Sequence, residues 1–159
     1  MRRVLYVLGS LFLAIIAIGA LAIGYAAWNG QALDAESKAY VDAAIPAITS
    51  NWSEAELMNR ATPELRASTS PEEVDQLFQT FSRVGHLVVY KGSSGQSLMS
   101  YVAGTGKTIS ASYVAKASFQ NGDATIRIGL LKRSGQWLIS NFNVRFDSAV
   151  AARLRQMST

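Results

Sequence analysis

The stretch Ala103–Thr108, with the sequence AGTGKT, contains the Gly-Lys-Thr ending of a nucleotide-binding P-loop. A complete P-loop also requires a glycine five residues before Gly106 and a helix directly after the threonine, whose N-terminus holds the phosphates. Position 101 is a tyrosine, and the residues after Thr108 alternate between apolar and polar side chains. The sequence therefore predicts a hairpin turn with a solvated Lys107 and no nucleotide binding.

Isomerase-type chemistry would need a carboxylate base and a hydroxyl donor held in an apolar pocket. Three tyrosines are candidate donors or pocket-lining residues: Tyr90, Tyr101 and Tyr113. Between residues 86 and 146 the only carboxylate is Asp123, which falls in an expected hairpin turn. Asp42 is the acid closest to an expected apolar helix stripe, and we interpret it as an exposed flanking residue. The sequence thus contains candidate hydroxyl donors but no carboxylate at a position expected to line the pocket as a base.

His86 is the only histidine, and the chain contains no cysteine. Its position directly after an expected helix end indicates a surface or rim side chain, and no GxSxG nucleophile pattern is present. Metal binding would need further histidines, cysteines or carboxylates at ligand-like spacing. We therefore expect no metal site, no cofactor and no catalytic residue, which favours a protein that is not an enzyme.

The N-terminal segment is uncharged from residue 4 to residue 28. A helix of this length would extend about 37 Å, more than the roughly 30 Å hydrocarbon core of a bilayer. We predict a transmembrane anchor over residues 4–28, preceded by a short terminus (1–3) and followed by a linker (29–33). The alternative is a secretory signal cleaved after Ala20–Ala22.

Two arginines precede the span and predict that the N-terminus is cytoplasmic. The chain would then be a single-pass protein of the inner membrane, with lipid around residues 4–28 and a periplasmic or other extracytoplasmic domain. Within that domain charge is uneven, because residues 34–75 carry nine carboxylates and three basic residues, whereas residues 76–159 carry two and ten. The simplest interpretation is that the acidic and basic halves face each other and partly neutralise each other's charge. The interpretation that implies a function is that the basic half forms a face that binds lipid headgroups, an acidic partner or a polyanion.

Residues 34–82 show the signals of several helices. On the first of them the apolar positions lie on one face: Val41, Ala44, Ile45 and Ile48. Pro46 should bend or shorten this helix near its end. Two short helices should follow, beginning at the capping signals Ser53–Glu56 and Thr62–Pro63.

The strongest helix signal is Ser70–Glu73, which combines a serine cap, a proline at the first helical position and a glutamate at the third. Apolar residues then recur with helical spacing: Val74, Leu77, Phe78 and Phe81. Gly85 provides a left-handed stop. This helix should bury one stripe against a broad apolar surface.

After Gly85 the period changes from 3.6 to 2, which predicts strands. Residues 86–91 and 97–103 are expected as two short strands, separated by a turn with the sequence GSSGQ. A longer strand should cover residues 107–120, with one apolar face: Ile109, Ala111, Tyr113, Ala115, Ala117 and Phe119. Lys116 should lie on the opposite face, where a basic residue prevents edge association.

The turn signal Asn121–Asp123 should connect this strand to the next, whose apolar face is Ala124, Ile126, Ile128 and Leu130, with Arg127 opposite. A final strand begins at Trp137, and its alternation slips near Ser140–Asn141, which predicts a β-bulge. Residues 148–159 form a weak terminal helix or tail. Helices followed by an antiparallel meander predict the α+β class. Because the aromatics lie with the apolar row and not among the charges, we do not expect nucleic-acid binding.

Residues 34–147 resemble the nuclear transport factor 2-like, or cystatin-like, superfamily. The most telling segment runs from Ala124 to Val144, where a penultimate strand, a polar turn, a tryptophan and a closing strand follow one another. The resemblance implies N-terminal helices packed on a curved, cone-like sheet, with Trp137 in the core more readily than against a ligand. A single span before such a domain also looks like assembly factors of type IV secretion systems and proteins associated with bacterial lipid-import complexes.

The sequence therefore favours a membrane-anchored, non-catalytic interaction or assembly domain that binds a partner protein or dimerises through its exposed sheet face. The alternative is a binder of small apolar ligands, or an isomerase-like enzyme, that uses the cone with the three tyrosines and Trp137 as contacts. A cavity lined by these tyrosines with a buried carboxylate would favour the alternative. A cone filled by Phe78, Phe81 and Trp137 would favour assembly.

Overall fold

The computed structural model describes residues 30–102 and 106–156. Contacts divide the chain into two units, Met1–Leu33 and Asp34–Thr159, and the second unit contains the helices α2 to α5 and the four-stranded sheet. The expected membrane anchor, residues 4–28, lies outside the described residues. Within the described ranges, no helix is both long enough and apolar enough to cross a membrane.

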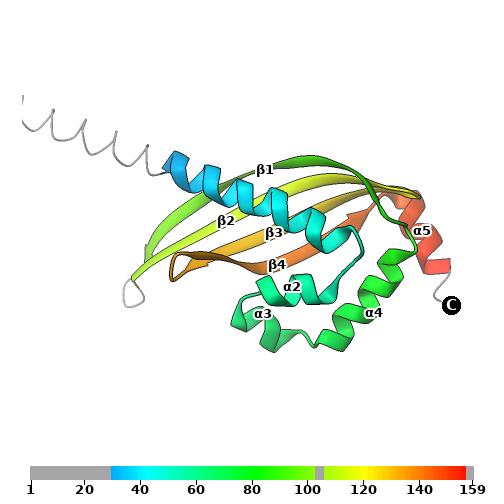
Figure 1. Cartoon of the computed structure of the whole chain (residues 1–159), viewed down its shortest axis with the longest axis horizontal. Coiled ribbons are helices and arrows are strands. Elements are labelled where there is room, and N and C mark those ends of the chain that lie inside the picture. Colours follow the sequence, from blue (N-terminus) through cyan, green and yellow to red (C-terminus); the bar gives the residue numbers. More distant parts are fainter. Residues whose placement is uncertain (1–29, 103–105, 157–159) are drawn as a thin grey trace, which may run out of the picture. The chain divides into compact units, whose positions relative to one another are not determined.

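The second unit is α+β, with helices that precede a curved four-stranded antiparallel sheet (Figure 1). The first helix ends at residue 49 and is followed by three more helices: α2 (Glu54–Arg60), α3 (Pro63–Ser68) and α4 (Pro71–Ser82). The strands lie in chain order in the sheet: β1 (Leu87–Val102), β2 (Gly106–Phe119), β3 (Gly122–Arg133) and β4 (Gln136–Phe146). A last helix, α5 (Ser148–Gln156), contacts β4. The first helix runs alongside β1 in Figure 1, whereas α2 and α3 contact β4.

The expected apolar stripe of the first helix is confirmed. Its four residues are all at most 1% exposed: Val41, Ala44, Ile45 and Ile48. Pro46 does not end the helix, which continues to residue 49, and the amide of Ser50 donates to the Pro46 carbonyl. A helical stripe with spacings of three and four is therefore sufficient to dock this helix on the sheet.

The helix caps follow the local sequence. At α4 the capping box is complete, because Ser70 Oγ accepts from the amide of Glu73 at 3.2 Å and Glu73 Oε2 accepts from the amide of Ser70 at 3.1 Å. At α2 only half of the expected box forms, since Ser53 Oγ accepts from the Glu56 amide while the Glu56 carboxylate pairs with Arg60. An ion pair one turn along the helix competes for the carboxylate that the box would need.

The expected turn between two short strands at residues 92–96 is wrong. β1 is one long strand, and its residues from Ser93 to Val102 pair in unbroken register with β2. The turn signal produces a β-bulge instead, because Lys91 and Gly92 together lie opposite the single residue Lys116. Gly92 has φ +87, a conformation that favours glycine.

The remaining strand predictions hold with small shifts. The hairpin between β2 and β3 turns at Gln120 and Asn121, one residue earlier than expected, so that Phe119 pairs with Gly122. The predicted bulge at Ser140 is confirmed, since Gly129 pairs with Asn141 and Leu130 with Ile139. β2 begins at Gly106, and Gly106 and Lys107 pair with Val102 and Tyr101, so the strand starts earlier in the AGTGKT stretch than expected.

The inner face of the sheet is buried under the helices, and an aromatic cluster centred on Trp52 fills one end of it. Trp52 is 6% exposed and stacks on Phe119 with ring centroids 5.1 Å apart. It also meets the rings of Phe78, Phe81 and Phe146 at 5.6, 5.2 and 6.1 Å. Trp52 lies between the first helix and α2, and its ring contacts residues of α4 and of the sheet.

Candidate functional site

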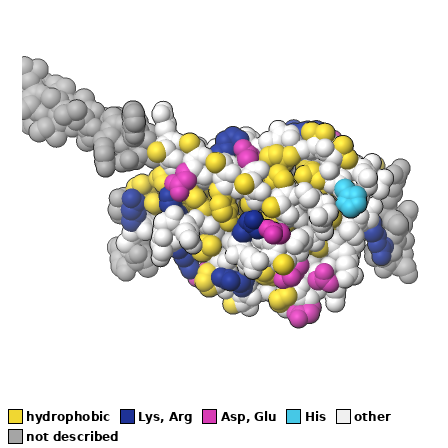
Figure 2. All heavy atoms as spheres, in the orientation of Figure 1, with side chains coloured by type: hydrophobic (Ala, Val, Ile, Leu, Met, Phe, Trp, Pro, Cys, Tyr) yellow, Lys and Arg dark blue, Asp and Glu magenta, His cyan; other side chains and the backbone are white. Residues whose placement is uncertain are grey.

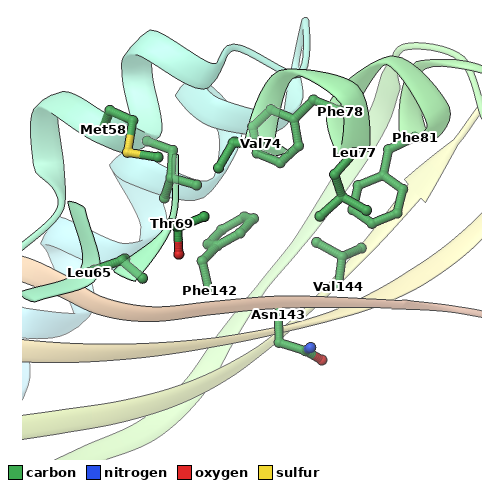
Figure 3. A pocket seen from close by; sticks show the side chains of 11 residues that line it. Met58, Leu65, Thr69, Val74, Leu77, Phe78, Phe81, Phe142, Asn143 and Val144 are labelled. Carbon is green, nitrogen blue, oxygen red and sulfur yellow. The ribbon is translucent and has the colours of Figure 1, made fainter. Parts of the chain in front are cut away.

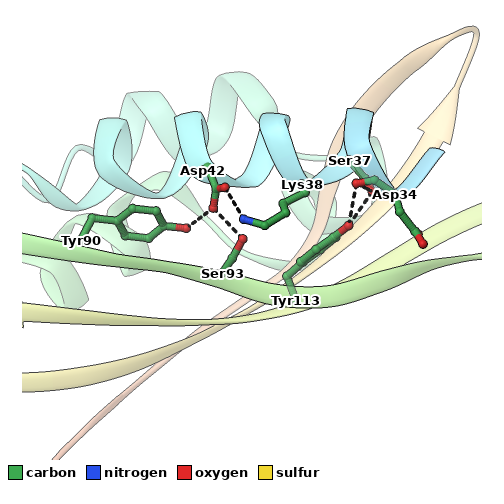
Figure 4. Close-up of polar contacts among 7 residues, drawn as sticks. All are labelled: Asp34, Ser37, Lys38, Asp42, Tyr90, Ser93 and Tyr113. Atoms are coloured by element: carbon green, nitrogen blue, oxygen red, sulfur yellow. Dashed lines mark hydrogen bonds and ion pairs between the residues drawn. The ribbon is translucent and has the colours of Figure 1, made fainter. Parts of the chain in front are cut away.

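A row of hydrogen bonds connects the first helix to β1 and β2, and it contains two of the candidate tyrosines (Figure 4). The Tyr90 hydroxyl and Ser93 Oγ on β1 both donate to Asp42 Oδ1, each at 2.6 Å. Lys38 Nζ donates to the other oxygen of the same carboxylate at 2.6 Å. We call Lys38, Asp42, Tyr90 and Ser93 the helix–strand network.

Asp42 therefore differs from the expectation of an exposed flanking residue. Its side chain is 33% exposed, and both carboxylate oxygens accept hydrogen bonds. Burial by itself raises the pKa of Asp42, but the hydrogen bonds from Lys38, Ser93 and Tyr90 outweigh burial and hold the pKa below its usual value. A general base that works near neutral pH needs a raised pKa and a free lone pair facing the substrate.

The pKa of Tyr90 shifts in the opposite direction to that of Asp42. Burial and the hydrogen bond that its hydroxyl donates to Asp42 raise the pKa of Tyr90 above its usual value of 10.0. The phenol thus keeps its proton and directs it at Asp42, so that Asp42 and Tyr90 satisfy each other. This hydrogen bond links the first helix to the edge strand β1 and occupies the hydroxyl of Tyr90 and Oδ1 of Asp42.

Tyr113 lies deeper, at 1% exposure in the core. Its hydroxyl lies 2.8 Å from Ser37 Oγ and donates to the Asp34 carbonyl at 3.1 Å. The carboxylate of Asp34 in turn accepts from the amide and the hydroxyl of Ser97, at 2.6 and 2.5 Å. This second group of contacts extends the attachment of the first helix to β1 and β2.

The other two candidates are separate from these contacts. The Trp137 side chain is 5% exposed and belongs to the core, with Lys132 Nζ 5.3 Å from its ring centroid. Tyr101 is placed only by its backbone, which pairs with Lys107; its side chain is outside the described part of the structure. The structure thus brings together Tyr90 and Tyr113 along the first helix, and their role as ligand contacts stays a prediction.

A concave apolar site lies elsewhere, between α4 and β4 (Figure 3). It has a volume of about 280 Å³ and is lined almost entirely by apolar side chains: Leu57, Met58, Leu65, Val74, Leu77, Phe78, Phe81, Phe142 and Val144, with Thr69 and Asn143 at its border. Phe142 and Val144 point from β4 toward α4, whereas Asn143 points to the other side of the strand. We call this site the α4–β4 groove.

The groove arises because α4 does not bury its whole apolar stripe. Val74 and Phe78 are buried, but Leu77 is 49% exposed. A second hollow at α5 shares Phe81 and Val144 with the groove and extends the apolar surface toward the C-terminal helix. The helical spacing predicts the apolar stripe on α4 but not the gap beneath it, and no local signal predicts that Leu77 is exposed.

The groove adjoins a sheet edge that is largely unpaired. Ala61 bridges β4 at Ile139, where the amide of Thr62 donates to the Ile139 carbonyl at 2.8 Å. Within the described ranges no further strand pairs with the outer edge of β4. An open strand edge beside an apolar groove has the two elements needed to bind an extended peptide, namely backbone groups and side-chain sites.

Among residues 30–102 and 106–156, no group of three carboxylate or histidine side chains is arranged to hold a metal ion. No family model, curated protein or solved structure matches the chain.

Proposed function

We propose that this chain is a membrane-anchored, non-catalytic interaction domain that binds a protein partner outside the cytoplasmic membrane and takes part in assembling an envelope complex. We further propose that residues 34–147 form a cone-like domain of the nuclear transport factor 2-like superfamily, behind an anchor at residues 4–28. The order of helices and antiparallel strands supports the superfamily assignment, and the uncharged N-terminal segment supports the anchor.

One observation carries the non-catalytic part of this proposal. The interior between the helices and the sheet is occupied by side chains, with the ring of Trp52 against Phe78, Phe81 and Phe119. Two carboxylates face β1: Asp42 has three hydrogen-bond donors on its two oxygens, and Asp34 accepts from the amide and the hydroxyl of Ser97. Isomerase-type catalysis would need an apolar pocket with a free carboxylate in it.

The surface that we assign to the partner is the α4–β4 groove with the open edge of β4. An extended segment of the partner would add to the edge through its backbone and insert apolar side chains against Leu77, Phe142 and Val144. Leu77 is suited to this role because it is a large apolar side chain that the domain itself leaves half exposed.

The alternative function, binding of a small apolar ligand, is favoured by the size and lining of the same groove. Its volume of about 280 Å³ is close to the lower end of the range for small-molecule sites, roughly 300–1,000 Å³. The ligand would be an apolar molecule with few polar groups, since Thr69 is the main hydroxyl at the border.

Native mass spectrometry of the full-length protein, extracted gently from its own membrane, distinguishes these functions. We expect the intact mass to include residues 1–28, together with a co-purifying protein that is lost in Leu77→Asp. Val88→Asp is the matched control, because Val88 is a 62% exposed apolar residue on β1 and is not part of the groove.

Each other outcome has a defined meaning. A small non-covalent adduct that leaves on activation, and that Leu77→Asp removes, would support the ligand-binding alternative. A partner retained equally by both variants would contradict the groove as its site. A mature N-terminus near residue 23 would overturn the anchor.

A further inference from the structure

The face of the sheet opposite the helices presents a cluster of basic residues. Burial alternates along β2 and β3, so that Lys116 and Arg127 are exposed while their neighbours in sequence are buried or half-buried. Arg145 on β4 is exposed on the same face, because Thr125 pairs with both Lys116 and Arg145 across the sheet. We call Lys116, Arg127 and Arg145 the basic triad and the face that carries it the outer sheet face.

The register places the triad close together. Arg127 pairs with Val114 on one side and with Asn143 on the other, so Lys116 and Arg145 are both its diagonal neighbours. Diagonal neighbours in a sheet lie about 7–8 Å apart at the backbone, within the reach of long side chains. Three positive charges in such an arrangement repel one another unless an anion lies between them.

The triad lacks the carboxylate partners that other basic residues of the domain have. Lys38, Arg60, Lys132 and Arg133 all pair with acids of the helical half of the domain. The face shown in Figure 2 accordingly has acidic and basic side chains next to one another. In the described part of the chain, no member of the triad forms an ion pair, and Asp123 at the end of β3 is already paired with Lys91.

The two arginines border a hollow of about 320 Å³ on this face. Its other polar residues are Ser112, Asn141 and Asn143, and Gly129 forms part of its floor. A Cβ at position 129 would lie only 3.2 Å from Ser140 Oγ, so the glycine keeps this part of the sheet open. Guanidinium, amide and hydroxyl groups around one hollow are donors suited to the oxygens of a phosphate group.

Exposed apolar side chains accompany the charges. Val114, which pairs directly with Arg127, is 39% exposed, and Leu98 on β1 is 61% exposed on the same face. Surfaces that bind at the membrane interface combine basic residues, which meet anionic headgroups, with apolar residues that enter the boundary beneath them.

We propose that the outer sheet face binds an anionic phospholipid surface, with a headgroup phosphate in the hollow between Arg127 and Arg145. The inference rests on the proposed anchor, which keeps the domain near a membrane, but it concerns a different surface from the α4–β4 groove. It also opposes dimerisation through the outer sheet face, because two copies would bring two basic triads together.

The absence of cysteine from the chain gives a direct test. Full-length Thr125→Cys is labelled with a fluorophore in the middle of the triad, and Gln76→Cys is labelled on the exposed side of α4 as a control for position. Both are reconstituted into vesicles of phosphatidylcholine alone or with phosphatidylglycerol, each doped with a nitroxide lipid that quenches the fluorophore on contact.

We expect strong quenching at position 125 only in the vesicles with phosphatidylglycerol, and little quenching at position 76 in either. The contact should be lost in 1 M salt, where the screening length falls to about 3 Å. Each basic residue at an anionic surface contributes about fivefold to binding, so Arg127→Gln with Arg145→Gln should weaken the contact about 25-fold. The matched control is Arg66→Gln with Lys107→Gln, which removes two exposed charges outside the triad and should leave the contact unchanged.

Equal quenching at position 125 in neutral and anionic vesicles would overturn the inference, as would equal effects of the two double variants. Displacement by inorganic phosphate at constant ionic strength would indicate a site for free phosphate, and protection only by an added acidic protein would indicate a protein surface; either would also overturn it. A chain that enters neither kind of vesicle would contradict the anchor. A chain that enters both without contact at position 125 would contradict this inference alone.

Discussion

The hydroxyl of Tyr90 on β1 donates a 2.6 Å hydrogen bond to Asp42 Oδ1 on the first helix, 48 positions earlier in the chain. Ser93, which directly follows the β-bulge at Lys91 and Gly92, donates to the same oxygen, and Lys38 donates to the other oxygen. A strand at the edge of the sheet is thereby tied to a helix through one carboxylate. Tyr90, which the sequence suggested as a hydroxyl donor, thus links the edge strand to the first helix.

Tyr90→Phe should lower the free energy of unfolding by about 1–2 kcal/mol, because the variant removes a hydrogen bond to a charged, partly buried acceptor. Urea denaturation of the full-length protein measures this change. Tyr40→Phe is the control, since the Tyr40 hydroxyl has no hydrogen-bond partner among the described residues and the change should be small. Equal losses in the two variants would show that the Tyr90–Asp42 bond contributes no stability.

The helix–strand network also predicts how stability depends on pH. The pKa of Asp42 is lowered in the folded chain, so its charged form stabilises the fold above the usual value of 3.8, and this contribution is lost as the pH falls through the folded value. The pKa of Tyr90 is raised, so its contribution is present below the usual value of 10.0 and is lost as the pH rises through the folded value.

Asp42→Asn tests the acidic side of this dependence. At pH 7 the variant should be less stable than the wild type, and the difference should shrink as the pH falls below about 4. Unfolding free energies at pH 7 and pH 3 measure it, with Asp75→Asn on the exposed side of α4 as a control for net charge. A difference that does not change with pH would mean that the ionised form of Asp42 has no special role.

Gly95 should tolerate no larger residue, although it lies in the middle of a strand. It pairs with Tyr113, and a Cβ at position 95 would lie 2.0 Å from the Ser112 carbonyl oxygen and 2.7 Å from Tyr113 Cα. Gly95→Ala should therefore destabilise the domain by about 1–3 kcal/mol through overpacking, with increased hydrogen exchange in β1. Ser94→Ala, at the exposed neighbouring position, should have little effect, and a similar effect of both would contradict the steric explanation.

Trp52 should be among the residues most sensitive to truncation. Its ring touches four phenylalanines, so Trp52→Ala should cost about 3–5 kcal/mol and abolish the near-ultraviolet circular dichroism of the aromatic cluster. Trp52→Phe should cost less, because the buried Nε1 has no hydrogen-bond partner among the described residues and a smaller ring still meets Phe119. Equal costs for both variants would contradict a role based on packing.

Local signals account for the parts of the fold that the sequence predicted. The cap of α4 depends on Ser70, Pro71 and Glu73, which all lie within four positions. The buried rows of β2 and β3 follow from strict alternation, and the bulge at Ser140 follows from a break in it. In each case the residues that cause the structure are neighbours in the chain, so their order is sufficient to predict the result.

Trp52 could have been predicted as a buried residue from one such signal. It directly precedes the Ser53 cap of α2, the position at which an apolar side chain often packs against the first turns of the helix. Its positive φ of 49° is a further feature that only the folded chain reveals. What the local signal could not give is the set of phenylalanines around it, which come from α4, β2 and β4.

The sequence by itself determined the α+β class, most element boundaries and the exposure of Lys116 and Arg127, because these follow from periods and caps within a few residues. Only the tertiary structure decided that GSSGQ continues a strand, because its residues pair with β2, where Gly95 lies opposite Tyr113. It likewise decided that Asp42 is held by Tyr90 and that Leu77 borders a groove. Such pairings depend on how a helix and a sheet edge meet in space, and residues 48 positions apart carry no local sign of that meeting.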